Sequence, residues 1–364
     1  MPHKTFEDLI KEVHKKGLCG QCGGCVSFCS AGEFGVIKMR EDGPPVYINK
    51  DKCLECGICY LICPQVLVFK EELKKKYEFN YPFGHYERII LAHTTDEVIA
   101  ELATDGGVVT SLLLFLLEKG LIDGAILSKK TGPFSREPVI ATTKQDIIDS
   151  AGSTFDISHS IHELSKFSTF TPTITSLKKS EEKEFKRLAV VGTPCQITTI
   201  RKMQMLGVVP SNNISYVLGL FCTENFSFDK FHKEKLENQL KIKLEEIKKI
   251  NIKEDLIIDL KNGKRLNIEF EKLEDYMRPA CRACKDYSNH FSDLSFGGLG
   301  APDGYTTVLI RRKNGKDIFD RAVQQGYIKE KPISKNEKQE IISKISQFSN
   351  WKAERTSKFL ERIE

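Results

Sequence analysis

The chain has 364 residues, with 55 Lys and Arg against 50 Asp and Glu and a formal net charge of +5 at pH 7. Its 40% apolar and 29% charged residues exclude a disordered or fibrous chain, and its length allows two or three domains. So small a net charge argues against a nucleic-acid partner. No apolar run approaches the roughly 20 residues of a membrane span, and the N-terminus lacks a signal-peptide core. We therefore expect a cytoplasmic protein that does not itself span a membrane.

Two cysteine runs stand near the N-terminus, and both have the spacing C-x2-C-x2-C-x3-C. They comprise Cys19, Cys22, Cys25 and Cys29, then Cys53, Cys56, Cys59 and Cys63. In a reducing compartment such runs favour metal binding over disulfides. The pair is the ligand pattern of a bacterial-type ferredoxin with two 4Fe–4S clusters, in which the fourth cysteine of each run binds the other cluster. This predicts one cluster on Cys19, Cys22, Cys25 and Cys63, and another on Cys53, Cys56, Cys59 and Cys29.

Two zinc sites are the alternative for these eight thiols. Zinc sites usually use C-x2-C pairs, so two complete four-cysteine runs favour iron–sulfur clusters. Ser30 stands where a proline usually follows such a run, but no ligand is lost. We expect a ferredoxin domain over residues 1–82.

From about residue 83 strands and helices alternate, which predicts a mixed α/β domain over 83–328. The expected elements are a strand at 88–92, a helix at 108–118, strands at 124–128 and 186–191, a helix at 196–205 and a strand at 214–220. Cys195 and Cys222 directly follow the last two strands, and open α/β sheets bind ligands at such strand ends. With the pair Cys281 and Cys284 they form a candidate third metal site. Structural thiols or a single zinc ion are the alternatives.

The remaining elements are a Lys/Glu-rich helix over 228–250, a hairpin of 256–260 with 265–270, a glycine-rich loop at 293–304 and a strand at 306–310. The tail over 329–364 places Ile341, Ile345, Phe348 and Trp351 at helical spacing. This apolar stripe either packs on its own domain or docks a partner, and we favour the former.

Six motifs in this order resemble the beta subunit of coenzyme F420-reducing hydrogenase. They are Thr104-Asp-Gly-Gly-Val-Val-Thr110, Ala151-Gly-Ser-Thr-Phe155, Gly192-Thr-Pro-Cys195, Phe221-Cys-Thr-Glu-Asn-Phe226, Cys281-x2-Cys284 and the stretch from Asp293 to Gly304. The resemblance covers residues 83–325. The ferredoxin domain ahead of it is similar to the input subunit of F420H2 dehydrogenases.

The resemblance implies an FAD-binding α/β domain with a third 4Fe–4S cluster on Cys195, Cys222, Cys281 and Cys284. Three clusters with four ligands each then account for all 12 cysteines. The implied FAD-binding residues are Thr104, Asp105, Gly106, Gly107, Thr110, Ser153, Thr154, Gly192, Thr193, Gln196, Glu224, Asn225 and Phe226. Each of them has an ordinary alternative, as a helix cap, a turn or a core residue. The segment 152–155 reads Gly-Ser-Thr-Phe where the family has Gly-Ser-Lys-Tyr, so contacts of that lysine and tyrosine lack a counterpart.

The function that the resemblance implies is hydride transfer between coenzyme F420 and FAD, with the clusters passing single electrons to or from a partner redox enzyme. Hydrogenase, formate or carbon monoxide dehydrogenase, heterodisulfide reductase and a membrane dehydrogenase are all compatible partners. We expect no catalytic side chain. A basic rim for F420 is expected from Lys129, Lys130, Arg201, Lys202, Arg278, Arg282 and Lys285. The alternatives are a reductase of another organic substrate, as in 7-hydroxymethyl chlorophyll reductase, and an electron-transfer scaffold without a substrate.

Overall fold

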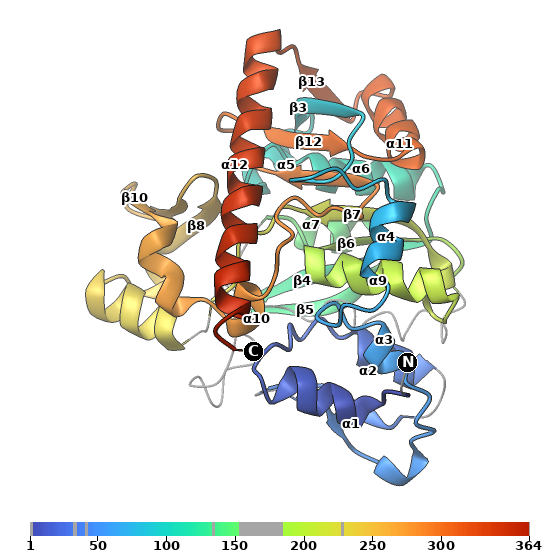
Figure 1. The fold of residues 1–364 in the computed structure, drawn as a ribbon. Helices are drawn as coiled ribbons and strands as arrows, with labels where there is room; N and C mark the ends of the chain where they lie inside the picture. Colours follow the sequence, from blue (N-terminus) through green and yellow to red (C-terminus); the bar gives the residue numbers. More distant parts are fainter. Residues whose placement is uncertain are drawn as a thin grey trace.

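The structure is a computed structural model that describes residues 3–31, 35–40, 43–132, 135–152, 185–226 and 229–363. Figure 1 shows a small N-terminal lobe below a large central sheet, with a second small sheet to one side. The long C-terminal helix runs beside the central sheet towards the N-terminal lobe (Figure 1).

The N-terminal lobe holds both cysteine runs. Its helices and strands are α1 (Phe6–Leu9) with the helical segment Ile10–His14, α2 (Gly24–Ala31), β1 (Ile37–Lys38), β2 (Val46–Tyr47), α3 (Ile58–Leu61) and α4 (Lys70–Lys76). A capping box of Thr5 and Asp8 starts α1. Strands β1 and β2 pair antiparallel as the sequence predicts. Phe6, Leu9 and Val13 pack in the core of the lobe, and several of the cysteines pack against them.

The central sheet has eight strands in the order β13-β3-β12-β11-β7-β6-β4-β5. Their bounds are β3 (Arg88–Thr94), β4 (Gly124–Gly132), β5 (Ser135–Ala141), β6 (Leu188–Gly192), β7 (Ile214–Leu220), β11 (Leu294–Gly297), β12 (Thr306–Ile310) and β13 (Ile328–Lys331). The four middle strands β11, β7, β6 and β4 run parallel, and the outer strands pair antiparallel. This is the predicted mixed α/β class.

Helices cover both faces of the central sheet, because its middle strands are apolar on both sides. On β4, Ala125 and Leu127 face one core while Ile126 faces the other, as the two-residue repeat of a strand requires. Helix α6 (Val108–Glu118) contributes to the first core and α9 (Pro194–Leu206) to the second. The other helices are α5 (Glu97–Leu102), α7 (Lys144–Asp149), α10 (Pro279–Arg282) and α11 (Lys313–Gln324).

The second sheet has three antiparallel strands in the order β10-β9-β8, with bounds β8 (Ile247–Ile252), β9 (Leu256–Leu260) and β10 (Arg265–Ile268). The predicted helix over 228–250 is wrong in its second half. The helical segment spans Asp229–Gln239, and the chain then enters β8. Ile247 and Ile250 are buried in the core of this sheet, so tertiary packing overrides the Lys/Glu helical pattern.

The C-terminal helix α12 (Lys335–Leu360) is an integral part of the fold. Ile341 and Ile345 are buried against the central sheet, and Trp351 packs with Phe270 of the second sheet. Phe359 packs against the core of the N-terminal lobe. The prediction that the apolar stripe packs on its own protein is therefore confirmed. The predicted boundary between 328 and 329 falls inside β13, which pairs with β3.

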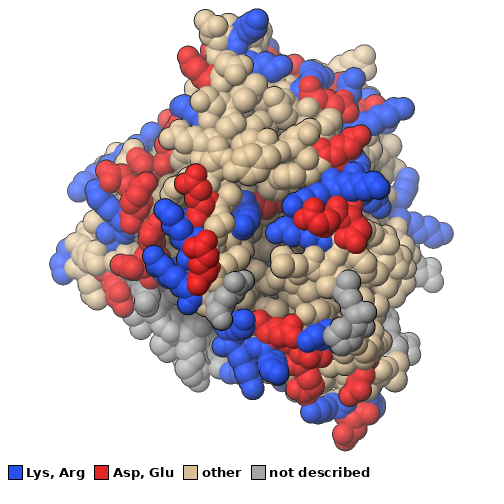
Figure 2. Space-filling model, in the orientation of Figure 1, with Lys and Arg blue, Asp and Glu red and all other residues tan. Residues whose placement is uncertain are grey.

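On the face in Figure 2, Lys and Arg side chains interleave with Asp and Glu, as the small net charge predicts. Within the described part of the chain, no helix is long and apolar enough to cross a membrane.

Candidate functional site

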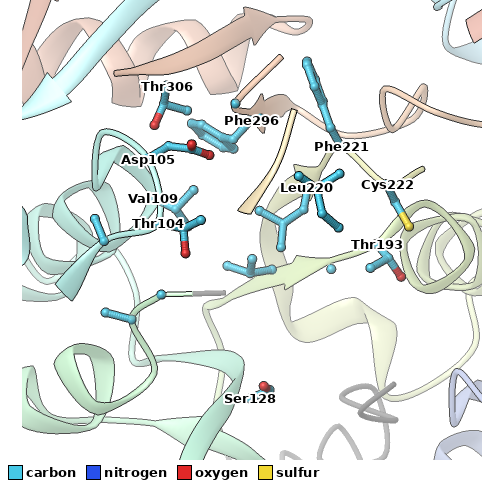
Figure 3. A pocket seen from close by; sticks show the side chains of 18 of the residues that line it. Thr104, Asp105, Val109, Ser128, Thr193, Leu220, Phe221, Cys222, Phe296 and Thr306 are labelled. Carbon is cyan, nitrogen blue, oxygen red and sulfur yellow. The ribbon is translucent and has the colours of Figure 1, made fainter. Parts of the chain in front are cut away.

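A cavity of about 360 Å³ lies at the carboxyl ends of the parallel strands. Leu127 and Ser128 of β4, the end of β6, Leu220 of β7 and Phe296 of β11 all line it. The carboxyl edge of an open α/β sheet is the usual ligand position. In Figure 3, Asp105, Phe296 and Thr306 lie on one side of the cavity, while Thr193 and Cys222 lie on the opposite side. The cavity size is that of a cofactor site.

The N-terminus of α6 opens into this cavity. Gly107, Val108, Val109 and Thr110 all line it. Gly107 is the N-cap residue with φ of 71°, and no side chain caps the helix. A Cβ at Gly107 would lie 2.9 Å from Ile99 Cγ2, so only glycine fits the close approach of the chain. Uncapped N–H groups at the start of a helix are suited to a phosphate, which fits the pyrophosphate of FAD.

Asp105 places a buried carboxyl group beside the helix start. Asn251 Nδ2 donates a hydrogen bond to Asp105 Oδ1 at 2.9 Å. Burial raises the pKa of Asp105, and the bond from Asn251 and the charge of Lys253 oppose that rise. Asn251 belongs to β8, so the second sheet forms part of the cavity wall. No motif of the sequence indicates this, because β8 reaches the cavity only through the tertiary packing of the second sheet.

Most of the predicted FAD-binding residues that the structure describes line the cavity: Thr104, Asp105, Gly107, Thr110, Gly192, Thr193, Gln196, Glu224 and Asn225. Gly106 and Phe226 do not line it. Gly106 packs between strands, where a Cβ would lie 2.5 Å from the carbonyl oxygen of Ala92. Phe226 is fully buried in the core of the second sheet. Ser153 and Thr154 lie outside the described residues.

Gln196 has a structural role as well. Its Oε1 accepts a hydrogen bond from the backbone N–H of Thr193 at 2.9 Å, which is half of a capping box at the start of α9. Thr193 Oγ1 lies 3.4 Å from Cys195 Sγ. The predicted cofactor residue therefore also orients the start of the helix that carries Cys195.

None of the predicted basic rim residues with a described side chain lines the cavity. Arg201 and Lys202 are buried, Arg201 in an ion pair with Asp293 at 2.7 Å. Lys129 pairs with two carboxylates of α7, and the side chain of Lys130 lies outside the described part. The remaining candidates Arg278, Arg282 and Lys285 bond to Gln21, the Glu274 carbonyl and Ser357.

The basic side chain that does line the cavity is Arg136 of β5. It is buried, and its guanidinium donates to Ser128 Oγ at 2.6 Å and to the carbonyl oxygens of Ser128 and Ser150 at 2.7 Å each. Arg136 stands in no recognisable motif, so the sequence analysis missed it.

Four thiols gather next to the cavity. Burial raises the pKa values of Cys195, Cys222 and Cys281, and the charges of neighbouring thiols raise them further. Such charge interactions link Cys195 with Cys222 and Cys284, and they link Cys281 with Cys222 and Cys284. Burial raises the pKa of Cys222 to about 12. The backbone N–H of Asn225 donates to Cys281 Sγ at 3.3 Å. Buried thiols with N–H···S bonds are the donor set that an iron–sulfur cluster requires, and a bound cluster holds its ligands as thiolates. The residues present therefore fit a cluster.

The same kind of charge interaction divides the eight N-terminal thiols into two groups. Charge interactions group Cys19, Cys22 and Cys25 with Cys63, and Cys53, Cys56 and Cys59 with Cys29. These are the two crossed ligand sets that the sequence pattern predicts. Backbone groups of Gln21, Val36 and Gln65 hydrogen-bond to Cys19, Cys29 and Cys63. Among the described side chains, no three His, Cys, Asp or Glu residues converge tightly enough to hold a single metal ion.

The three thiol groups lie in sequence from the cavity outward. Cys222 lines the cavity, and Cys195 of the same group interacts with Cys22 of the next. Thr199 connects the two, because its Oγ1 lies 3.5 Å from Cys22 Sγ and donates to the carbonyl oxygen of Cys195 at 3.1 Å. Cys25 then interacts with Cys59 of the outer group, where Cys56 is exposed.

Comparisons with known proteins agree with the six motifs. Residues 89–164 and 185–336 match the N-terminal and C-terminal parts of the family described as coenzyme F420 hydrogenase/dehydrogenase, beta subunit. Residues 46–66, which contain the second cysteine run, match a 4Fe-4S binding domain.

Individual relatives extend this match. The chain is 32% identical to the coenzyme F420 hydrogenase subunit beta of Methanosarcina barkeri, over 69% of this chain and 83% of that one. It is 31% identical to the coenzyme F420-dependent sulfite reductase of Methanocaldococcus jannaschii, over 86% of this chain, but it spans only 47% of that relative. A chain in the structure of the F420-reducing NiFe hydrogenase complex from Methanosarcina barkeri superposes with a TM-score of 0.69 at 29% identity, covering 78% of this chain and 94% of that one.

Proposed function

Because this chain belongs to the family of coenzyme F420 hydrogenase/dehydrogenase beta subunits, we propose that it transfers a hydride between coenzyme F420 and a bound FAD. It relays single electrons through three 4Fe–4S clusters to or from a partner redox enzyme, as a subunit of a larger complex. It is an oxidoreductase of the F420-linked class by family, and the cofactor set and the route are the proposal.

One observation carries the proposal: Cys222 belongs both to the cavity wall and to a group of four partly buried cysteines. A cofactor in the cavity therefore lies beside a site for a one-electron carrier. FAD, when bound, supplies the conversion between two-electron hydride transfer and one-electron transfer. The uncapped start of α6 supports the pyrophosphate, and the carboxyl ends of β6 and β7 support the rest of the cofactor.

The residues of the chain determine where F420 and electrons enter and leave. The buried wall of the cavity excludes water from the reacting face, and positioning supplies the rate because no acid or base is needed. At the other end, the exposed Cys56 marks the thiol group nearest to solvent, which is where a partner enzyme would exchange electrons. The successive thiol groups provide the path between these two ends.

The test is oxidation of reduced F420 by the purified, anaerobically reconstituted chain with a viologen acceptor, with NADH and NADPH in parallel. We expect FAD at one per chain, twelve irons at four for each cluster, and rapid turnover with the deazaflavin alone. Absence of turnover from a chain that carries FAD and twelve irons would overturn the F420 assignment. A chain that binds iron but no flavin would instead support the scaffold alternative.

A further inference from the structure

A lysine is buried beside the third thiol group, and among the described residues no ion pair joins it to a carboxylate. Lys352 of α12 is 1% exposed. Its Nζ donates to the carbonyl oxygen of Cys222 at 2.6 Å and to that of Asp286 at 2.8 Å. Neither acceptor carries a formal charge, so these bonds fix the position of the ammonium group but do not neutralise it.

The buried carboxylate of Glu224 is already paired with a different cation. Glu224 Oε2 accepts from Arg355 Nη1 at 2.6 Å, and both side chains are at least nine-tenths buried. Lys352, Arg355 and Glu224 together therefore carry one net positive charge. The carboxylate of Asp286, whose carbonyl Lys352 contacts, is bound instead to the backbone N–H groups of Asn289 and His290. An uncompensated buried charge is costly, so an anion must lie close to it. Among charged groups, the thiols of Cys284 and Cys222 act on Lys352 most strongly, ahead of Arg355 and Cys281.

Helix α12 also fixes the backbone of these ligands. Thr356 Oγ1 donates to the carbonyl oxygen of Cys284 at 2.9 Å, one helical turn from the contacts of Lys352. The family match ends at residue 336, so this part of the helix lies beyond it.

We propose that Lys352 is a positioning residue that raises the reduction potential of the third iron–sulfur cluster by holding a fixed positive charge against it. Reduction adds a negative charge to the cluster, and a nearby buried cation stabilises that charge. The higher reduction potential favours the reduced state of the cluster beside the cavity. This inference depends on the third cluster of the proposed function.

The experiment is an anaerobic EPR-monitored redox titration of the full chain with dithionite, which needs no F420. The signal of the third cluster is identified by its loss in the Cys195→Ala variant. In Lys352→Met we expect the ratio of reduced to oxidised third cluster at a fixed potential to fall at least tenfold, which is 59 mV for a one-electron couple. Lys352→Arg should keep the potential of the native chain.

Lys344→Met is the matched control, because Lys344 lies on the same helix but is half exposed and pairs with Glu254 at 2.5 Å. It removes the same charge and should move no potential. An unchanged third-cluster potential in Lys352→Met with twelve irons would overturn the proposal.

If Lys352→Met loses iron, Glu224→Gln decides the question. Removing that carboxylate leaves the local charge more positive, so the same potential must rise, and a potential that stays constant would refute the charge effect. Iron content and EPR signals in Cys195→Ala equal to those of the native chain would show instead that Cys195 holds no cluster, whatever Lys352 does.

Discussion

At the scale of single residues, the site depends on positions where only one residue type fits. Gly107 combines a positive φ with close contacts to Ile99 and Thr94, and this geometry exposes the N–H groups of α6 to the cavity. Lys352 and Arg136 are buried cations held by carbonyl oxygens, which keeps each charge in one place. Such residues act through their position. Conservative substitutions at them should therefore affect flavin binding, cluster reduction potential and stability separately.

Gly107→Ala should lower flavin content. The new Cβ meets Ile99 at 2.9 Å and the backbone has φ of 71°, so the helix start must shift. We expect FAD affinity to fall at least tenfold, measured by flavin absorbance after anaerobic dialysis. Gly120→Ala is the control, since it has φ of 59° near the other end of the same helix and open space around it. Equal flavin in both variants would contradict the role of the α6 N-terminus.

Acid should destabilise the protein partly through His290. Burial lowers the pKa of His290 to about 4 from an ordinary 6.5, so the folded state keeps it neutral. The unfolded chain binds a proton first, and stability is therefore lost as pH falls from about 6.5 towards 4, by about 2 kcal/mol at pH 5. His290→Phe should show a smaller drop in the thermal midpoint between pH 7.5 and pH 5. An identical drop in both proteins would refute this contribution.

At the scale of elements, α12 connects the three parts of the protein. Its apolar residues pack against the central sheet, the second sheet and the N-terminal lobe, while its polar residues contact the third thiol group. Strand β8 has a similar double role, because it pairs in the second sheet and contributes Asn251 to the cavity. Neither element contains a ligand motif. Even so, β8 contributes to the cavity wall and α12 contacts the third thiol group.

Ile345→Ala should destabilise the whole chain. Ile345 is 0% exposed, and truncation of a buried isoleucine costs about 3 kcal/mol because it removes apolar burial and leaves a cavity. The anaerobic thermal midpoint should fall by several degrees. Ser343→Ala, at an exposed position of the same helix, should leave it almost unchanged. A midpoint for Ile345→Ala equal to that of Ser343→Ala would show that α12 is a dispensable tail.

At the scale of the whole molecule, the fold places the three thiol groups one after another, starting from the cavity. The cavity, the group of Cys195, the group of Cys22 and the outer group of Cys56 follow one another. Cys222 belongs to the cavity wall, and charge interactions link Cys195 to Cys22 and Cys25 to Cys59. The N-terminal lobe is joined to the central domain by buried contacts, such as the bonds of Lys202 Nζ to the carbonyl oxygens of Cys63 and Val66 at 2.7 Å. In the proposed function, these contacts join the two domains into one electron path.

Interrupting this path at different points should have different effects. Cys195→Ala should let reduced F420 bleach the flavin but leave both ferredoxin clusters oxidised, although dithionite still reduces them. Cys56→Ala should cost only the outer cluster, with the two remaining clusters reduced by F420. The measurement is stopped-flow flavin absorbance with freeze-quench EPR. Normal reduction of the ferredoxin clusters in Cys195→Ala would place the path elsewhere.

The sequence by itself predicted the strands β3, β4, β6, β7 and β12, the helices α6 and α9, the grouping of the N-terminal thiols and most of the cavity-lining motifs. These features are local: cysteine spacing, a two-residue apolar repeat, and glycines at strand-to-helix turns. It also indicated the third thiol group, because Cys195 and Cys222 follow buried strands that end at the same edge of the sheet. The predicted glycine-rich loop at 293–304 is wrong at its start, because β11 (Leu294–Gly297) lies in the middle of the central sheet.

Only the tertiary structure decided which distant residues complete the site. Asn251, Arg136 and Lys352 carry no motif, and their roles arise because separate elements pack together. The charged residues of β8 favour a helix, while its pairing with β9 is a long-range effect that the local sequence does not show. The described basic candidates near the motifs do not line the cavity, since Arg201 and Lys202, for example, are buried in the core. Distance along the chain does not give distance in space, and burial decides where a charge can act.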